Sequence, residues 1–211
     1  MQKWKALLLI MAVSCGLIGC GKDKEPEVSS VSISKDGTIV HQIVGDFEQN
    51  YYEMAGLQAL ASDRVAEYCA DNGEDSVTLT SVEEKDGRIL IQLRYATDRD
   101  YSKFNNRDLF IGTLTEAYIQ GYPLEGVPFV STEGKPIEFG DMEDRDSKQI
   151  AIVATKPTEE LVVNTYGKVL YINRSSAGEP EISFYGKNGA HITYPASEDT
   201  DESVLSYIIF K

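Results

Sequence analysis

Basic residues are scarce in this sequence relative to acidic ones. Its 211 residues include 20 Lys and Arg against 34 Asp and Glu, a formal net charge of −14 at pH 7. Proteins that bind nucleic acid present a basic surface, because they must neutralise phosphates. The acidic balance therefore argues against nucleic acid as a partner. It also disfavours a protein that lies flat on anionic lipid.

A hydrophobic run long enough to cross a membrane is also missing. Residues 6–18 form an uncharged apolar run, but a bilayer core requires roughly 20 such residues. The run directly follows a short segment that contains Lys3 and Lys5. A positive start followed by a short apolar region is typical of a secretory signal peptide.

The end of this run carries a more specific motif. Leu17, Ile18, Gly19 and Cys20 resemble the lipobox of bacterial lipoproteins, whose pattern is Leu-x-Gly-Cys. The resemblance implies that residues 1–19 are a lipoprotein signal peptide and that the Cys20 thiol receives a diacylglycerol. The protein is then expected to be anchored to the cell membrane, facing outside the cytoplasm. Residues 20–30 are polar and lack an apolar face, so they are expected to form the lipidated cysteine and a flexible tether.

Cysteine and tryptophan become scarcer still in the mature protein that this motif implies. Cys15 leaves with the signal peptide and Cys20 is lipidated, so Cys69 is the one cysteine left to the domain. An internal disulfide is therefore excluded, and burial must stabilise the core. Cleavage also removes Trp4, which is the single tryptophan, and two lysines, so the net charge falls from −14 to −16.

The first half of the mature sequence alternates between strand and helix patterns. Alternating apolar residues around Asp36-Gly37 predict a hairpin over residues 31–44. Apolar residues at helical spacing predict a helix over residues 53–71, ended by Asn72-Gly73. A second hairpin is expected over residues 77–95, with its turn at Asp86-Gly87. These elements form a ββαββ unit, a helix on an antiparallel sheet.

The remaining sequence predicts short elements. A helix is expected over residues 98–105, with Asp98 as N-cap and Tyr101 and Phe104 facing inward. A strand is expected over 109–111 and a short helix over 113–120. Tyr166-Gly167 and Asn188-Gly189 are expected to turn two further hairpins. Strands are expected over 127–130, 150–155, 161–164, 168–173, 181–185, 191–194 and 204–210.

The sequence thus predicts an α+β protein, in which the ββαββ unit precedes a mainly antiparallel β region. A boundary near residues 121–126 would divide it into an α+β domain over 31–122 and a β-rich domain over 127–211. One continuous domain is the alternative.

Residues that could support catalysis are few. His41 and His191 both lie on predicted strands, far apart and without a second metal ligand nearby, so ordinary strand positions are expected for both. Cys69 lies beside the apolar face of the predicted helix and reads as a small buried hydrophobe. Ser32 and Lys35 have the Ser-x-x-Lys spacing of penicillin-binding enzymes, but they lie on a predicted strand rather than a helix.

An acid-rich segment supplies the candidate metal ligands. Asp141, Glu143, Asp144 and Asp146 could offer carboxylates to a calcium ion, as could residues 198–202. Both segments lack the glycine and terminal glutamate of an EF-hand loop, so a solvated loop is the ordinary expectation. The sequence predicts no cofactor.

The mature region resembles small uncharacterised lipoproteins of anaerobic Gram-positive bacteria. The resemblance rests on the hairpin–helix–hairpin opening and on the closing residues from Tyr207 to Lys211, and it implies no activity. The leading hypothesis is a non-enzymatic binding or interaction module of the cell envelope, whose partner is an envelope protein or ligand. An envelope hydrolase, or a subunit of one, and a calcium-stabilised adhesin are the alternatives.

Overall fold

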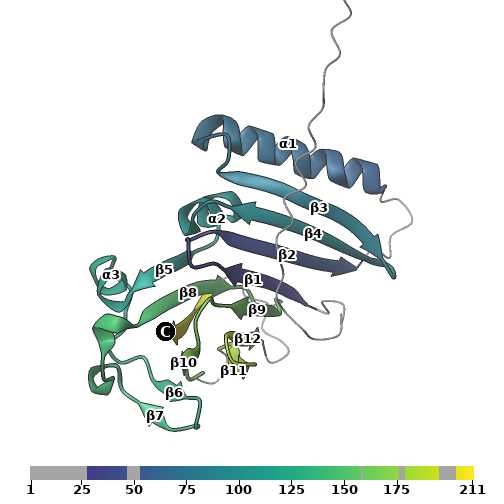
Figure 1. Cartoon of the computed structure of the whole chain (residues 1–211). Coiled ribbons are helices and arrows are strands. Elements are labelled where there is room, and N and C mark those ends of the chain that lie inside the picture. Colours follow the sequence, from purple (N-terminus) through teal and green to yellow (C-terminus); the bar gives the residue numbers. More distant parts are fainter. Residues whose placement is uncertain (1–27, 47–52, 158, 176–178, 195–202) are drawn as a thin grey trace, which may run out of the picture.

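The computed structural model describes residues 28–46, 53–157, 159–175, 179–194 and 203–211 (Figure 1). Its helices and its two largely antiparallel sheets confirm the predicted α+β class. The predicted signal peptide, Leu17, Ile18, Gly19 and Cys20 lie outside the described residues. So do most of the predicted tether and the acidic residues 198–202.

The predicted ββαββ unit is confirmed. It comprises β1 (Ser29–Ile33), β2 (Ile39–Asp46), α1 (Met54–Asn72), β3 (Val77–Lys85) and β4 (Arg88–Tyr95). Both hairpin turns fall where the sequence places them. The second turn needs left-handed backbone, with φ of 52° at Asp86 and 76° at Gly87. Only short polar residues and glycine adopt that conformation readily, which is why an Asp-Gly pair marks this turn.

Helix α1 turns its predicted apolar side toward β3. Its partly buried Val65, Tyr68 and Cys69 pack against the core, and the helix ends at Gly73 (φ 117°). No residue of α1 is fully buried, because the helix lies along the β3 edge of its sheet rather than across the centre (Figure 1).

The next elements are α2 (Asp98–Asn105), β5 (Leu109–Thr113) and α3 (Leu114–Ile119). Tyr101 and Phe104 are buried as predicted. The predicted cap of α2 is wrong by one residue, since Thr97 accepts the hydrogen bond from the Asp100 backbone. Asp98 instead joins α2 to β5, because its Oδ2 accepts a hydrogen bond of 2.9 Å from the Ile111 N–H.

The later part of the chain is built of short strands, as the sequence predicts. They are β6 (Phe129–Ser131), β7 (Pro136–Ile137), β8 (Gln149–Thr155), β9 (Leu161–Asn164), β10 (Val169–Asn173), β11 (Glu181–Tyr185), β12 (Gly189–Thr193) and β13 (Val204–Phe210). Two short 3-10 helices, η1 (Phe139–Asp141) and η2 (Arg145–Ser147), lie between β7 and β8. No pattern in the sequence indicates β7, which is two residues long.

Both sheets combine strands from either side of residues 121–126. The seven-stranded sheet has the order β11-β12-β9-β1-β2-β4-β3, and β1 pairs with β9 in parallel. The six-stranded sheet has the order β5-β8-β13-β10-β6-β7. The strand pairing therefore favours one continuous domain over two domains divided at these residues.

One predicted hairpin is wrong. Tyr166-Gly167 does not join paired strands, since β9 lies in the seven-stranded sheet and β10 in the six-stranded one. A Cβ atom at Gly167 would lie 2.7 Å from the backbone of Lys211. Glycine at this position allows a close approach to the C-terminal residue where the chain crosses between sheets. The Asn188-Gly189 hairpin, between β11 and β12, is confirmed.

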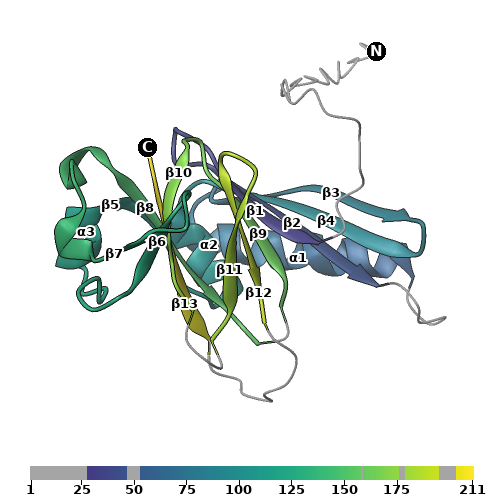
Figure 2. The ribbon, with the colours of Figure 1, turned by 90° about the horizontal axis from the view of Figure 1, so that it is seen from below.

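The main hydrophobic core lies between the two sheets. Figure 2 shows the strands of both sheets from a second direction. Val31, Val163 and Ile192 of the larger sheet meet Val153 and Ile208 of the smaller sheet there. A second core covers the opposite face of the smaller sheet, beneath α3. Because that sheet is buried on both faces, β8 and β13 are mostly apolar rather than alternating.

Candidate functional site

A cleft of about 600 Å³ opens where β2, the residues after α2 and the β8–β9 connection meet. That volume is in the range of small-molecule sites. Its lining combines a few apolar side chains with a larger number of polar ones. The lining residues are Val28, Ser29, His41, Ile43, Val44, Gly45, Asp46, Arg88, Asn105, Arg107, Glu159, Glu160 and Leu161.

His41 is the most buried polar residue of the cleft lining. It lies on β2, only 7% exposed, with its ring centroid 5.3 Å from that of Tyr101 and 6.5 Å from that of Tyr95. Its Nδ1 atom has no hydrogen-bond partner in the described part of the chain. Burial, and then the positive charge of Arg107, lower the pKa of His41 to about 4. The imidazole is therefore neutral at neutral pH.

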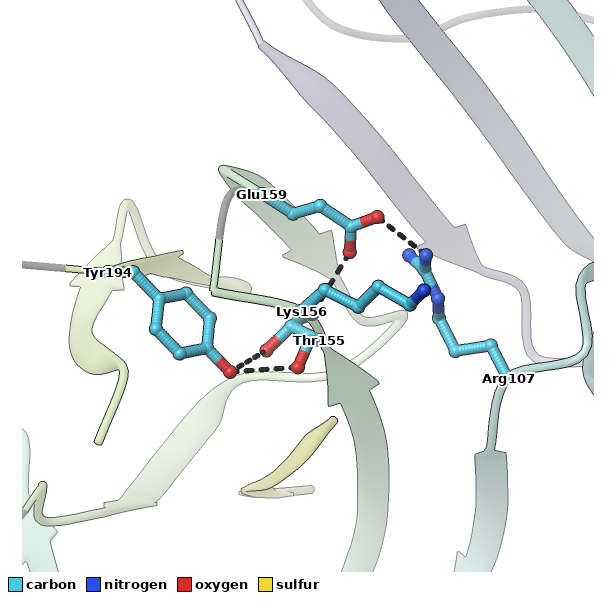
Figure 3. Close-up of polar contacts among 5 residues, drawn as sticks. All are labelled: Arg107, Thr155, Lys156, Glu159 and Tyr194. Atoms are coloured by element: carbon cyan, nitrogen blue, oxygen red, sulfur yellow. Dashed lines mark hydrogen bonds and ion pairs between the residues drawn. The ribbon is translucent and has the colours of Figure 1, made fainter. Parts of the chain in front are cut away.

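An ion pair forms the wall beside His41. Arg107 Nη2 lies 2.5 Å from Glu159 Oε1, and this pair joins the residues after α2 to the β8–β9 connection (Figure 3). Glu159 Oε2 also accepts a hydrogen bond of 3.1 Å from the Lys156 N–H. Close by, the Tyr194 hydroxyl donates to the Thr155 carbonyl at 2.8 Å. Both carboxylate oxygens of Glu159 are thus engaged, so its position is fixed.

Asn105 connects the cleft to the aromatic cluster behind it. Its Nδ2 donates to the Tyr101 carbonyl at 2.8 Å and to the Tyr95 hydroxyl at 3.2 Å. Burial raises the pKa of Tyr101 to about 12, and its buried hydroxyl also lacks a described partner. Two unsatisfied polar atoms, His41 Nδ1 and Tyr101 Oη, therefore lie in neighbouring rings. Native structures seldom leave such atoms unpaired.

The remaining charged side chains of the cleft also have partners. Glu160 Oε1 lies 2.7 Å from His191 Nε2, and Arg88 Nε lies 4.0 Å from Asp46 Oδ1. Glu160 is half exposed and Asp46 largely exposed, so these groups form the mouth of the cleft rather than its floor.

The two histidines have different surroundings in the fold. His41 pairs with Leu93 across the sheet and faces the core, whereas His191 contacts Glu160 and the ring of Tyr185. The sequence predicts an ordinary strand position for His41, and it does not indicate that His41 lines a cleft. Arg107 and Glu159 lie in connections, 52 residues apart in the sequence, and no motif marks either of them.

Cys69 and Ser32 occupy structural positions. Cys69 is half-buried against the core, and its thiol donates to the Val77 carbonyl at 3.2 Å. Ser32 lies on β1, where its hydroxyl accepts from Asn164 Nδ2 at 3.3 Å. Ser32 thus lies on a strand, as predicted, whereas Lys35 lies in the turn that follows it.

The acid-rich segment lies around η1 and η2. Asp141 ends η1, Asp144 is the N-cap of η2 with φ 51°, and Asp146 lies within η2. Glu143 contributes its backbone carbonyl, which accepts from the Lys148 ammonium. Among the described residues, no three His, Cys, Asp or Glu side chains are grouped so that they could hold a metal ion.

A second cavity, of about 440 Å³, adjoins this segment. Its lining is half apolar and half polar. The apolar side chains are Leu114, Tyr118, Phe139 and Met142, and the polar ones are Thr115, Asp144, Arg145 and Asp146. The Arg145 guanidinium lies over the Phe139 ring, 5.4 Å from its centroid. This cavity lacks a buried unpaired polar atom of the kind that His41 provides.

No family model, curated protein or solved structure matches this chain. No helix within the described residues is long and apolar enough to cross a membrane.

Proposed function

We propose that this protein is an exported lipoprotein, anchored outside the cytoplasm through Cys20, whose folded domain is a non-enzymatic binding module of the cell envelope. Support for the anchor is the order of Lys3 and Lys5, the apolar residues 6–18 and the Leu-x-Gly-Cys pattern. A lipid contributes about 0.8 kcal/mol per buried CH₂, and two or more chains hold a protein stably on a membrane.

The cleft beside His41 carries the proposal of ligand binding. Its volume of about 600 Å³ is in the range of small-molecule sites, and its lining brings convergent polar groups together with a few apolar side chains, so it is more polar than most such sites. The Arg107–Glu159 pair holds two connections together at its wall. A site built this way is preorganised, so less order must be gained when a ligand binds.

A Cys20→Ala variant tests the anchor. Cells that express the natural chain and the variant are fractionated, and the mass of each product is measured. The natural protein should be found in membranes, with the mass of a lipidated chain that begins at Cys20. The variant should be released or remain as an uncut precursor. Recovery of the variant in membranes at the mature, lipidated mass would contradict the proposal.

An envelope hydrolase is the second candidate function, and one observation favours it. The neutral imidazole of His41 lines the same cleft as the carboxylates of Glu159 and Glu160. A neutral imidazole can accept a proton as a general base, and a pKa of about 4 makes that of His41 a weak one at neutral pH. Hydrolysis of an envelope component by the purified protein, abolished by His41→Gln, would favour the hydrolase. Binding without turnover would favour the binding module.

A further inference from the structure

We infer that the cleft beside His41 takes a small, uncharged, hydroxyl-bearing ligand of the sugar or polyol class. This inference rests on the proposal that the cleft is a binding site, and it specifies the chemistry of what binds there.

The charges of the cleft are already matched within the protein. Arg107 pairs with Glu159 at 2.5 Å, and the side chains are only 19% and 31% exposed. A ligand anion would have to compete with the Glu159 carboxylate for the guanidinium. Separating a largely buried ion pair leaves a charge without compensation, which is unfavourable. The wall therefore offers hydrogen-bonding groups without a free charge.

The charged groups at the mouth of the cleft also have counter-charges. Glu160 Oε1 lies 2.7 Å from His191 Nε2, and Asp46 Oδ1 lies 4.0 Å from Arg88 Nε. A charged ligand of either sign would compete with one of these pairs, whereas a neutral ligand competes with none.

Hydroxyl groups suit the hydrogen-bonding groups that remain. Arg107 carries five N–H donors, and the contact with Glu159 uses its Nη2. The neutral imidazole of His41 has one donor and one acceptor nitrogen, and Nδ1 is buried away from solvent, which leaves Nε2 as the nitrogen that a ligand could reach. A hydroxyl both donates and accepts, so it can pair with either kind of group. Ile43, Val44 and Leu161 provide an apolar surface for the C–H groups of such a ligand.

Three sugars of nearly the same shape test the inference about charge. Glucose is neutral, glucosamine is cationic and glucuronate is anionic at neutral pH. Binding of each to the full chain in detergent is measured by calorimetry and by the NMR signals of the two histidines. We expect glucose to bind at least ten-fold more tightly than the two charged sugars and to shift the signal of His41. We also expect its affinity to change little between low and high salt.

A pair of glycine variants tests the location. Gly45 lies on β2 and lines the cleft, and a Cβ atom there would meet nothing within 4 Å. Gly45→Leu should therefore fill the cleft without disturbing the fold and weaken glucose binding at least ten-fold. Gly56 on α1 is outside the cleft lining and equally open, so Gly56→Leu is the matched control and should bind as the natural chain does.

The possible outcomes separate the two proposals. Tighter binding of either charged sugar, abolished by Gly45→Leu, would overturn the inference about charge while leaving the cleft as a binding site. Glucose binding that Gly45→Leu leaves unchanged would overturn the location. The weakest specific affinities correspond to dissociation constants on the order of 10 mM. If neither the three sugars nor glycerol binds at such concentrations, the proposed ligand class is wrong.

Discussion

His41 should make the stability of the protein depend on pH in a window that can be calculated. Its pKa is lowered from 6.5 to about 4 in the folded protein, chiefly by burial. Below pH 6.5 the unfolded chain gains a proton that the folded chain does not. Stability is therefore complete above pH 6.5 and is lost as the pH falls from 6.5 toward 4. One pKa unit corresponds to about 1.4 kcal/mol, so the total loss is about 3 kcal/mol, of which about 2 kcal/mol occurs between pH 7.5 and pH 5.

A His41→Phe variant isolates this contribution from the many carboxylates that also titrate. Phenylalanine keeps an aromatic ring against Tyr95 and Tyr101 and removes the unpaired Nδ1, so its stability at pH 7.5 should be within about 1 kcal/mol of the natural protein. Between pH 7.5 and pH 5, the natural protein should lose about 2 kcal/mol more of its free energy of unfolding than the variant loses. Urea unfolding followed by circular dichroism measures both, and it does not need a tryptophan signal.

A direct titration provides the control. The sequence contains two histidines, so His191→Gln leaves one imidazole NMR signal, whose pKa should be about 4. The reasoning is refuted if that signal titrates near 6.5. It is also refuted if the stability difference between the natural protein and His41→Phe is the same at pH 7.5 and pH 5.

Four further substitutions test three separate features of the fold by urea unfolding. Tyr101→Phe should leave stability unchanged or raise it by up to about 1 kcal/mol, because the buried hydroxyl has no described partner; Tyr95→Phe loses the contact with Asn105 and should be less stable than Tyr101→Phe. Thr113→Ala should lower the free energy of unfolding by about 1 kcal/mol, because it removes the capping box of α3. A loss below roughly 0.3 kcal/mol would contradict that capping role. Gly167→Ala should cost about 2 kcal/mol or more, since its Cβ would lie 2.7 Å from the backbone of the C-terminal residue, and an unchanged midpoint would refute the close contact.

Local features of the fold could be predicted because they depend on neighbours in the sequence. The Asp86-Gly87 turn, the end of α1 at Gly73 and the inward positions of Tyr101 and Phe104 all follow from backbone conformation or from spacing. The cap of α2 was misplaced because Thr97 and Asp98 are both good capping residues. Which of them caps depends on Asp98 having another partner, Ile111, in a neighbouring strand.

The pairing of distant strands could not be predicted in this way. Tyr166-Gly167 has the composition of a hairpin turn, but β9 pairs with β1 and β12, while β10 pairs with β13 and β6. Alternating apolar residues specify which face of a strand is buried, and they carry no information on which strand lies beside it.

The sequence alone therefore determined the α+β class, the positions of most strands and helices, and the motif at Cys20 on which the proposed anchor depends. The tertiary structure decided that strands from both halves share two sheets, and it brought His41, Arg107 and Glu159 to one cleft. The physical reason is that propensity, turn chemistry and periodicity act over a few residues. A site assembled from a strand and two connections exists only once long-range packing has closed the chain.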